Sequence, residues 1–384
     1  MTRRDIRMEQ LNFLDYLLDQ NNIEMKQLSE TERLDQSVQP LLEWFEVFAR
    51  TMPWRSNPEP YWVWISEIML QQTRVEAVRA YFDRFIAALP NIAALANVED
   101  EKLMKLWEGL GYYSRARNLK KAAIVCVEQY HGELPRTYEA LLKLPGIGSY
   151  TAGAIASIAY EQEVPAVDGN VLRVISRLLA WEEDITKQSV KRKMEAALLE
   201  LMKRVHPNPR TFTAALMELG ALVCIPNGAP CCMECPWKSI CLARIQKKVE
   251  RIPVKKKKIV RKIEERTVFL IQDGDLTAIK KRPSTGLLAG LYELPNIEGF
   301  YSEQEVKRIW EEKLKLPLTV ERLKDGKHIF SHIEWHMQAY RVIIPKILEQ
   351  NKLLREQEGE LFFVTQEELN TNYALPNAFK TWKK

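Results

Sequence analysis

The sequence predicts two domains of different fold class, an all-α domain followed by a smaller α+β domain. The chain has 384 residues, which is more than one hydrophobic core usually serves. From Pro40 to about Leu242, apolar residues recur at helical spacing, and alternating β-branched runs are scarce. From about residue 265 onward the pattern changes to short runs of β-branched and aromatic residues, which are typical of strands.

Local signals divide the chain into four segments. Residues 1–36 are polar with weak periodicity and form an N-terminal extension to which we assign no purpose. The helical domain spans 37–246, with breaks expected at Pro53, Pro90, Gly132, Pro145, Pro165 and Pro207. Residues 247–264 are rich in Lys and Arg and contain a proline, so they read as a basic linker that is either a solvated connector or a phosphate contact. In the α+β domain, 265–384, we expect strands at 267–272, 276–281, 328–333 and 339–344, and helices at 302–314 and around 366–369.

The composition excludes several classes of protein. The hydrophobic fraction of 46% and charged fraction of 28% are ordinary for a soluble globular chain. A net charge of +5 permits a polyanionic partner without requiring one. No apolar run approaches the ~20 residues of a membrane span, and the first residues lack the apolar core of a signal peptide. We therefore expect a cytoplasmic protein.

Five of the six cysteines fall between Cys224 and Cys241, while Cys126 sits alone in an apolar run and is expected in the core. Clustered cysteines in a cytosolic protein indicate a metal centre rather than disulfides. The spacing C-x6-C-C-x2-C-x5-C lacks the second short pair of a zinc ribbon and favours a [4Fe–4S] cluster over zinc. Five thiols compete for four places, so the ligand set stays open. Our choice is Cys224, Cys232, Cys235 and Cys241, with Cys231 as the spare, and a structural rather than a redox role.

The stretch Leu144-Pro-Gly-Ile-Gly148 carries the strongest local signal. Two glycines one residue apart, ahead of a helix-like run at 151–160, make a tight turn that aims a helix N-terminus at an anion. Asp168, in Val167-Asp-Gly-Asn170, follows on a loop and would lie near whatever the turn holds. Taken alone, the glycine turn can also be a plain connector, and Asp-Gly a simple turn former.

Together the glycine hairpin, the aspartate some twenty residues later and the cysteine cluster resemble the helix-hairpin-helix DNA glycosylases. Within that family the chain is similar to the enzymes that remove adenine mispaired with 8-oxoguanine. This closer resemblance covers roughly residues 40–384 and is carried by 53–55 (PWR), 63–73 (VWISEIMLQQT), 108–113 (EGLGYY), 166–170 (AVDGN) and 286–291 (GLLAGL). Members that also cut the DNA backbone have a lysine two residues after the second hairpin glycine. This chain has Tyr150 there, and a phenol cannot form a Schiff base, so the resemblance implies a monofunctional glycosylase.

The resemblance assigns the chemistry to two carboxyl groups. Glu67, in an apolar setting that favours its protonated form, would protonate N7 of adenine and later act as base for water. Asp168 would stabilise the oxocarbenium ion, and a covalent acetal with it is compatible with the family. Tyr150 and Asn170 would hold both groups in place by hydrogen bonds.

The same resemblance implies a flipped-out adenine in double-stranded DNA. Gln72 and Tyr112 match positions that wedge into the duplex, and Leu144, Gly146 and Gly148 match the hairpin that binds DNA. Trp54, Arg55 and Leu70 match the adenine pocket. Ala214 stands where relatives often have Glu or Gln, which puts some adenine contacts in doubt.

The C-terminal region resembles a Nudix fold but has no Glu-rich helix after Gly286 to Pro295, so nucleotide hydrolysis is not expected. Phe330, Ser331 and His332 match the reader of 8-oxoguanine, with Ser331 facing N7–H or O8 of the lesion. The histidines at 328, 332 and 336 are explained by alternation along a strand rather than by a metal. The implied partner is duplex DNA carrying A opposite 8-oxoguanine or guanine, bound by a monomer associated with a bacterial nucleoid.

Two other functions stay open at this point. One is a glycosylase–lyase for oxidised pyrimidines, which Tyr150 and the C-terminal domain oppose. The other is a non-catalytic iron–sulfur DNA-binding regulator, in which Glu67 and Asp168 would be idle.

Overall fold

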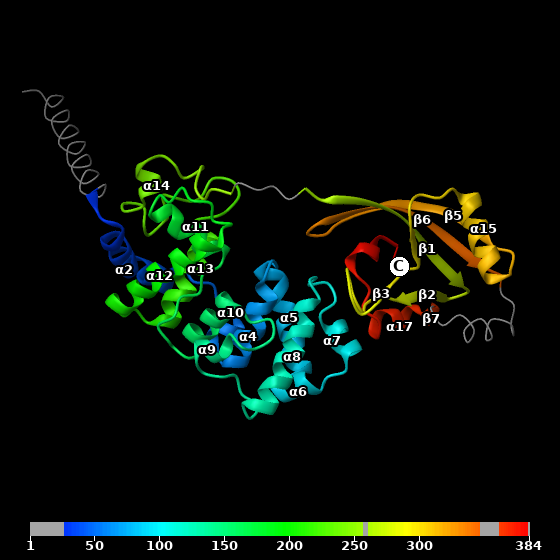
Figure 1. Ribbon diagram of the computed structural model, residues 1–384, viewed down its shortest axis with the longest axis horizontal. Helices are drawn as coiled ribbons and strands as arrows, with labels where there is room; N and C mark the ends of the chain where they lie inside the picture. Colours follow the sequence, from blue (N-terminus) through cyan, green and yellow to red (C-terminus); the bar gives the residue numbers. More distant parts are fainter. Residues whose placement is uncertain (1–26, 256–259, 346–360, 383–384) are drawn as a thin grey trace, which may run out of the picture. The chain divides into compact units, whose positions relative to one another are not determined.

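The computed structural model describes residues 27–255, 260–345 and 361–382, and the chain forms two compact units (Figure 1). The first unit contains the described residues up to Phe82, Asn91–Ala93 and residues from Ala122 through the helical region. The second contains Asp83–Pro90, Ala94–Lys121 and the C-terminal region. Two stretches of the expected helical domain, Asp83–Pro90 and Ala94–Lys121, therefore group with the C-terminal region.

The region up to residue 245 is helical, as expected. Its helices are α2 (Glu30–Phe48), α3 (Pro53–Ser56), α4 (Pro60–Leu70), α5 (Val75–Ala88), α6 (Ile92–Asn97), α7 (Asp100–Leu106), α8 (Ser114–Gln129), α9 (Tyr138–Leu141), α10 (Ser149–Ala154), the π-helix η1 (Ile155–Ala159), α11 (Gly169–Leu178), α12 (Gln188–Val205), α13 (Pro209–Leu222) and α14 (Leu242–Ile245). None of the described helices is long and apolar enough to cross a membrane.

Helix α2 begins inside the segment that we assigned to the N-terminal extension. Ser29 and Glu32 form a reciprocal capping box, which satisfies free N–H groups of the first turn. Leu34 is buried, so the helix belongs to the core from its first turns. Residues 1–26, the rest of the expected extension, lie outside the described part of the chain.

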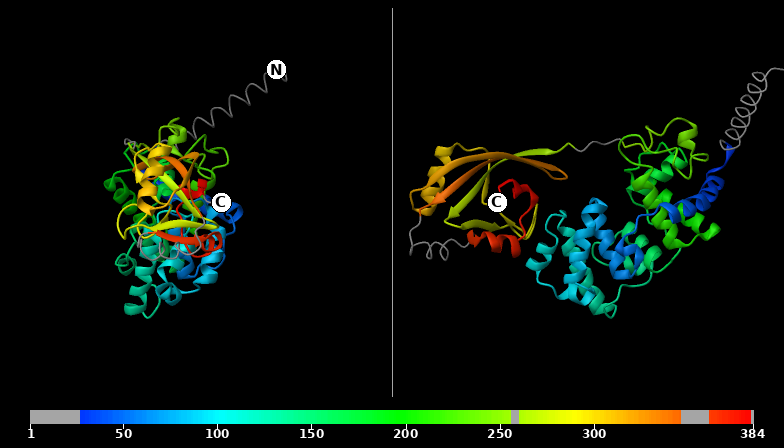
Figure 2. Two further views of the ribbon diagram at one scale, coloured as in Figure 1. Left: turned by 90° about the vertical axis from the view of Figure 1, so that its right-hand side faces the viewer. Right: turned by 180° about the vertical axis from the view of Figure 1, so that it is seen from behind.

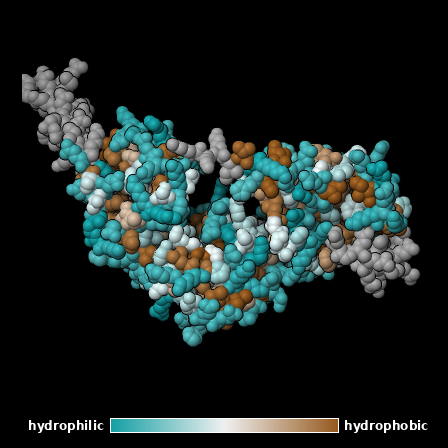
Figure 3. All heavy atoms as spheres, in the orientation of Figure 1, coloured by the Kyte–Doolittle hydropathy of each residue, from teal (hydrophilic) through white to brown (hydrophobic). Residues whose placement is uncertain are grey.

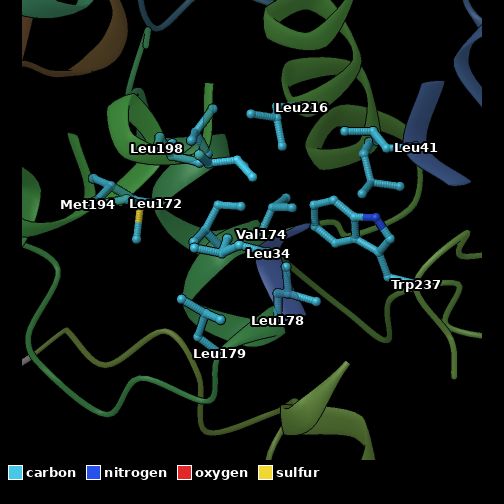
Figure 4. Packing of buried hydrophobic residues seen from close by; sticks show 14 of the residues in the cluster. Leu34, Leu41, Leu172, Val174, Leu178, Leu179, Met194, Leu198, Leu216 and Trp237 are labelled. Atoms are coloured by element: carbon cyan, nitrogen blue, oxygen red, sulfur yellow. The ribbon is translucent and has the colours of Figure 1, made fainter. Parts of the chain in front are cut away.

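The core of the first unit packs α2, α11, α12 and α13 around one apolar cluster (Figure 4). Leu34 and Leu41 of α2 face Val174 and Leu178 of α11, with Trp237 beside them. Cys224, Cys235 and Cys241 pack against the same cluster. The core therefore joins α11, the helix that follows Asp168, to the loop that contains Cys224 to Cys241, which we call the cysteine loop.

The second unit contains a seven-stranded mixed sheet with the order β3-β2-β1-β6-β5, in which β4 also pairs with β1 and β7 with β2. Its strands are β1 (Lys262–Asp273), β2 (Leu276–Lys281), β3 (Tyr292–Glu293), β4 (Asn296–Glu298), β5 (Thr319–Ile329), β6 (Ile333–Ile344) and β7 (Leu361–Thr365). β1 and β6 run parallel from Lys262↔Ile333 to Asp273↔Ile344, and the other pairs are antiparallel.

Helices cover both faces of this sheet (Figure 2). On one face, α15 (Glu303–Leu314) packs Trp310 against Phe269. On the other, α17 (Gln366–Thr371) and the 3-10 helix η2 (Asn377–Trp382) bury Phe379 near Trp335. The visible surface of the chain is mostly hydrophilic, with hydrophobic residues in separate small groups (Figure 3). The expected α+β fold is confirmed.

Two expected boundaries differ from the structure. The strand expected at 328–333 is wrong, because β5 ends at Ile329 and Phe330–His332 form the turn into β6. The basic linker is also shorter than its sequence suggests. Ile252 is buried, its carbonyl accepts from Arg177 Nε at 2.8 Å, and β1 already begins at Lys262. Lys256–Ile259, which hold most of the lysine run, lie outside the described residues.

Candidate active site

One cavity of about 360 Å³ in the first unit collects every residue expected in the catalytic and adenine-binding sets. Its lining includes Glu67, Tyr150, Asp168 and Asn170 from the catalytic set, and Trp54, Arg55 and Leu70 from the adenine set. The volume is in the range of small-molecule sites. Residues more than a hundred positions apart in sequence therefore share one concave site.

Glu67 lies in α4, a helix whose residues from Val63 to Met69 are all buried. Only 4% of Glu67 is exposed, and its Oε2 accepts a hydrogen bond from the Tyr150 hydroxyl. Burial raises the pKa of Glu67 to about 7, and the nearby Asp168 carboxyl adds to this rise. The Tyr150 hydrogen bond and the Arg55 charge oppose it. Such a carboxyl can carry or release a proton near neutral pH.

Asp168 is the N-cap of α11. Its carboxylate accepts from the Val171 backbone N–H at 2.8 Å and from Asn170 Nδ2 at 2.7 Å. Burial raises the pKa of Asp168, while these hydrogen bonds and the Arg173 charge act in the opposite direction. The donors and the helix N-terminus favour the ionised form. The two acids of the cavity thus have different surroundings.

Arg173 connects this acid to the cysteine loop. Its Nη2 donates to Asn170 Oδ1 and to the Gly220 carbonyl, both at 2.8 Å, and its Nε donates to the Cys224 carbonyl at 2.7 Å. A Cβ on Gly220 would come 2.6 Å from Cβ of Asn170, so α13 approaches α11 as closely as it does only because residue 220 is glycine. Asn170 is therefore fixed from two sides.

The glycine hairpin has the geometry that its sequence predicts. Gly146 has φ +77°, in the left-handed region that glycine tolerates, and Gly148 is the extended N-cap of α10. Both glycines are exposed. The side chain of Leu144 is buried, so this residue offers only its backbone to a partner.

The four cysteines that we chose as ligands line one small cavity with Arg177 and Trp237. Cys231 is exposed and is not part of this lining. Within the described ranges, no group of His, Cys, Asp or Glu is arranged to hold a single metal ion. Four thiols around one cavity are the donor set that a [4Fe–4S] cluster requires.

Both expected wedge residues have left-handed backbone. Gln72 has φ +59° after the end of α4, and Tyr112 has φ +47° in the second unit. Both side chains are exposed. For residues with a Cβ this conformation costs about 1 kcal/mol or more and is concentrated at functional sites.

The expected reader residues line a cavity of about 430 Å³ within the second unit. Ser331 Oγ lies 3.0 Å from the Tyr112 hydroxyl, and the Phe330 ring packs edge-on to Trp335 with centroids 5.0 Å apart. Position 328 lies in β5, 332 in the turn and 336 in β6, so alternation along one strand was the wrong explanation for the three histidines. His336 Nε2 contacts Glu334 at 2.7 Å.

The sequence did not point to Glu218 or Arg50, which also line the first cavity. Glu218 is 1% exposed and contacts both Arg50 and Arg55. A carboxylate in the apolar helix α13 was the available signal, because a buried acid needs a charged partner.

Comparison with known proteins assigns the chain to a family. Residues 65–200 match the HhH-GPD superfamily base excision DNA repair protein model, and residues 267–383 match the NUDIX domain model. The chain is 35% identical to the adenine DNA glycosylase of Mus musculus, over 79% of this chain and 70% of that protein. It is 34% identical to the Homo sapiens enzyme, over 89% and 73%, and 33% identical to that of Buchnera aphidicola subsp. Baizongia pistaciae, over 80% and 86%.

The chain belongs to the adenine DNA glycosylase family. It is a base excision repair enzyme that hydrolyses N-glycosyl bonds, with a helix-hairpin-helix catalytic region and a C-terminal Nudix-like domain. The family membership confirms the resemblance on which the sequence interpretation depends.

Proposed function

We propose that this adenine DNA glycosylase removes adenine paired with 8-oxoguanine, or with guanine, by monofunctional hydrolysis. The observation that supports the proposal is that Glu67, from α4, and Asp168, the N-cap of α11, line the same cavity. The hydroxyl of Tyr150 contacts Glu67 at the position where a lyase would need an amine.

The reaction divides between the two acids. Glu67 enters protonated and gives its proton to N7 of the extruded adenine, so the base leaves as a neutral molecule when the C1′–N9 bond breaks. The electron pair of that bond goes to the base, and the positive charge on the sugar is opposed by ionised Asp168. Glu67, now ionised, takes a proton from the water that attacks C1′, which restores the starting state.

The groups around the acids fix their positions. Tyr150 holds the Glu67 carboxyl, and Asn170 holds Asp168 from the first turn of α11. The exposed Gly146 and Gly148 fit a role in contacting a DNA phosphate through backbone N–H groups. Gln72 and Tyr112, exposed and already strained, fit the role of wedges that replace the extruded base.

Cys224, Cys232, Cys235 and Cys241 would hold a [4Fe–4S] cluster, with Cys231 outside the ligand set. All four border one cavity, and Cys224, Cys235 and Cys241 pack beside the core that supports α11. Bound there, the cluster would supply four metal–thiolate cross-links to the loop, which is structural chemistry rather than a step of the reaction.

In the Nudix-like domain, Ser331 would recognise 8-oxoguanine through the N7–H or O8 that guanine lacks. The turn Phe330–His332 presents this hydroxyl beside Tyr112, a wedge residue, which supports recognition of the lesion close to the inserted side chain.

The test is a duplex with a labelled A-containing strand opposite 8-oxoguanine. Strand breaks that appear only after alkali are the expected result. Breaks without alkali would indicate a lyase, and none in either condition would indicate a protein that binds without catalysis. Glu67→Gln is expected to abolish breaks while binding of the same duplex persists.

A further inference from the structure

Glu218 is the buried centre of an ion cluster that the sequence interpretation did not include. Its Oε1 accepts from the backbone N–H of Arg50 at 3.0 Å and from Arg50 Nε at 2.8 Å. Its Oε2 accepts from Arg50 Nη2 at 3.0 Å and from Arg55 Nη2 at 2.8 Å. The Glu218 side chain is 1% exposed, although it lies in the wall of the cavity that contains Glu67.

These contacts exclude a direct role for Glu218 toward a substrate. An ionised carboxylate has about four acceptor sites, and four donors occupy them. The two guanidinium groups lower the pKa of Glu218 to about 2 despite its burial, so this acid has no proton to deliver near neutral pH. It differs in this from Glu67, the other buried glutamate of the cavity.

What Glu218 does hold is Arg55. The Arg55 guanidinium donates to Glu218 and to the Arg50 carbonyl at 3.3 Å, and it lies 5.5 Å from the Phe45 ring centroid. Of its five N–H donors, these two contacts leave others for a ligand. The Arg55 charge is also close enough to Glu67 to lower the pKa of that acid.

The helix around Glu218 gives this arrangement a second consequence. Ala214 lies four residues earlier in α13, on the same face of the helix, and also lines the cavity. Its methyl group offers a base no hydrogen bond. Position 214 therefore offers the cavity no carboxylate. The charged group that α13 holds at this wall is Arg55, through its ion pair with Glu218.

We infer that Glu218 is a positioning residue that fixes the Arg55 guanidinium in the wall of the adenine cavity and holds Arg50 in the segment between α2 and α3. The inference rests on the proposed function. An extruded adenine then meets a cation that is already oriented, so the site does not spend binding energy on ordering a long side chain.

A double-mutant cycle tests this role. Glu218→Gln, Arg55→Met and the double variant are compared with wild type in single-turnover adenine release from an A:8-oxoguanine duplex at saturating enzyme. Affinity is measured separately with a duplex carrying uncleavable 2′-fluoro-2′-deoxyadenosine opposite 8-oxoguanine. Thermal unfolding of each variant is followed by circular dichroism. Asp35→Asn is the matched control, because it breaks the Asp35–Arg204 ion pair between α2 and α12, and neither residue lines the cavity.

We expect Glu218→Gln to slow adenine release on the order of 10- to 100-fold, the cost of a misplaced active-site group. Affinity for the uncleavable duplex should stay within about twofold, since most of that affinity comes from phosphate contacts. In the Arg55→Met background, Glu218→Gln should slow the reaction less than about twofold further, because two residues that act through one contact are not additive.

Three results would overturn the inference. They are a wild-type rate in Glu218→Gln, an equal loss of rate in both backgrounds, and a loss that Asp35→Asn reproduces. If Glu218→Gln does not fold, Glu218→Asp takes its place in the cycle, since it keeps the buried charge and shortens its reach. Absence of adenine release by wild type would instead contradict the proposed function.

Discussion

Replacing Glu67 by Gln is expected to make the protein more stable while it abolishes the reaction. Burial raises the pKa of Glu67 from 4.5 to about 7 in the folded chain. A difference of this size corresponds to about 3 kcal/mol of unfolding free energy. The native state binds a proton here that the unfolded chain has already lost, so this stability is fully present below pH 4.5 and disappears as the pH rises through 7. Glutamine does not titrate, so the stability of the Glu67→Gln variant lacks this dependence on pH.

The assay is urea unfolding of wild type and Glu67→Gln, followed by tryptophan fluorescence at several pH values between about 5 and 8.5. The variant should gain stability relative to wild type across this range, by up to about 3 kcal/mol. Glu46→Gln, a change at an exposed glutamate of α2, is the control and should show no comparable trend. If the difference in unfolding free energy between wild type and Glu67→Gln does not change with pH, Glu67 is not protonated in the native state near neutral pH, and the reasoning is refuted.

Three further predictions concern residues around the two sites. Tyr150→Phe removes a hydrogen bond that lowers the pKa of Glu67, so the alkaline limb of the single-turnover rate should move up by roughly one pH unit, and a downward move would contradict this. Ser331→Ala should reduce the preference for 8-oxoguanine over guanine by about tenfold in competition assays and leave release from A:G duplexes intact, whereas an unchanged preference would discredit the reader assignment. Gly220→Ala places a Cβ 2.6 Å from Cβ of Asn170. The variant should lose about 1–3 kcal/mol of unfolding free energy and should release adenine more slowly. Wild-type stability and a wild-type rate would show that α13 can shift freely.

Sequence motifs predicted the residues of the candidate site better than they predicted the residues that hold them in place. Glu67, Tyr150 and Asp168 were expected together, and one cavity contains them. Glu218 was not expected, because its partners lie 163 and 168 positions earlier and no local pattern links them. A charge that is satisfied only by the fold is not visible in the sequence around it.

The boundaries failed for local reasons. Alternation through Ile333 suggested one strand, but the Phe330 N–H donates to the Ile333 carbonyl at 2.8 Å and closes a hairpin turn, which alternation does not encode. The start of α2 could have been found, since Ser29 and Glu32 are a capping-box pair in the sequence. The grouping of Ala94–Lys121 with the C-terminal unit depends on contacts such as Lys105 Nζ to the Tyr373 carbonyl at 3.0 Å, which join positions 268 apart.

The most direct test of the account is single-turnover adenine release by wild type, Glu67→Gln, Asp168→Asn and the double variant on an A:8-oxoguanine duplex. If the two acids act as a unit on one nucleoside, each single change should slow release by at least about 10²-fold, and the double variant should be little slower than the slower single variant. A near wild-type rate in either single variant, or losses that multiply in the double variant, would contradict the claim that Glu67 and Asp168 share one reaction.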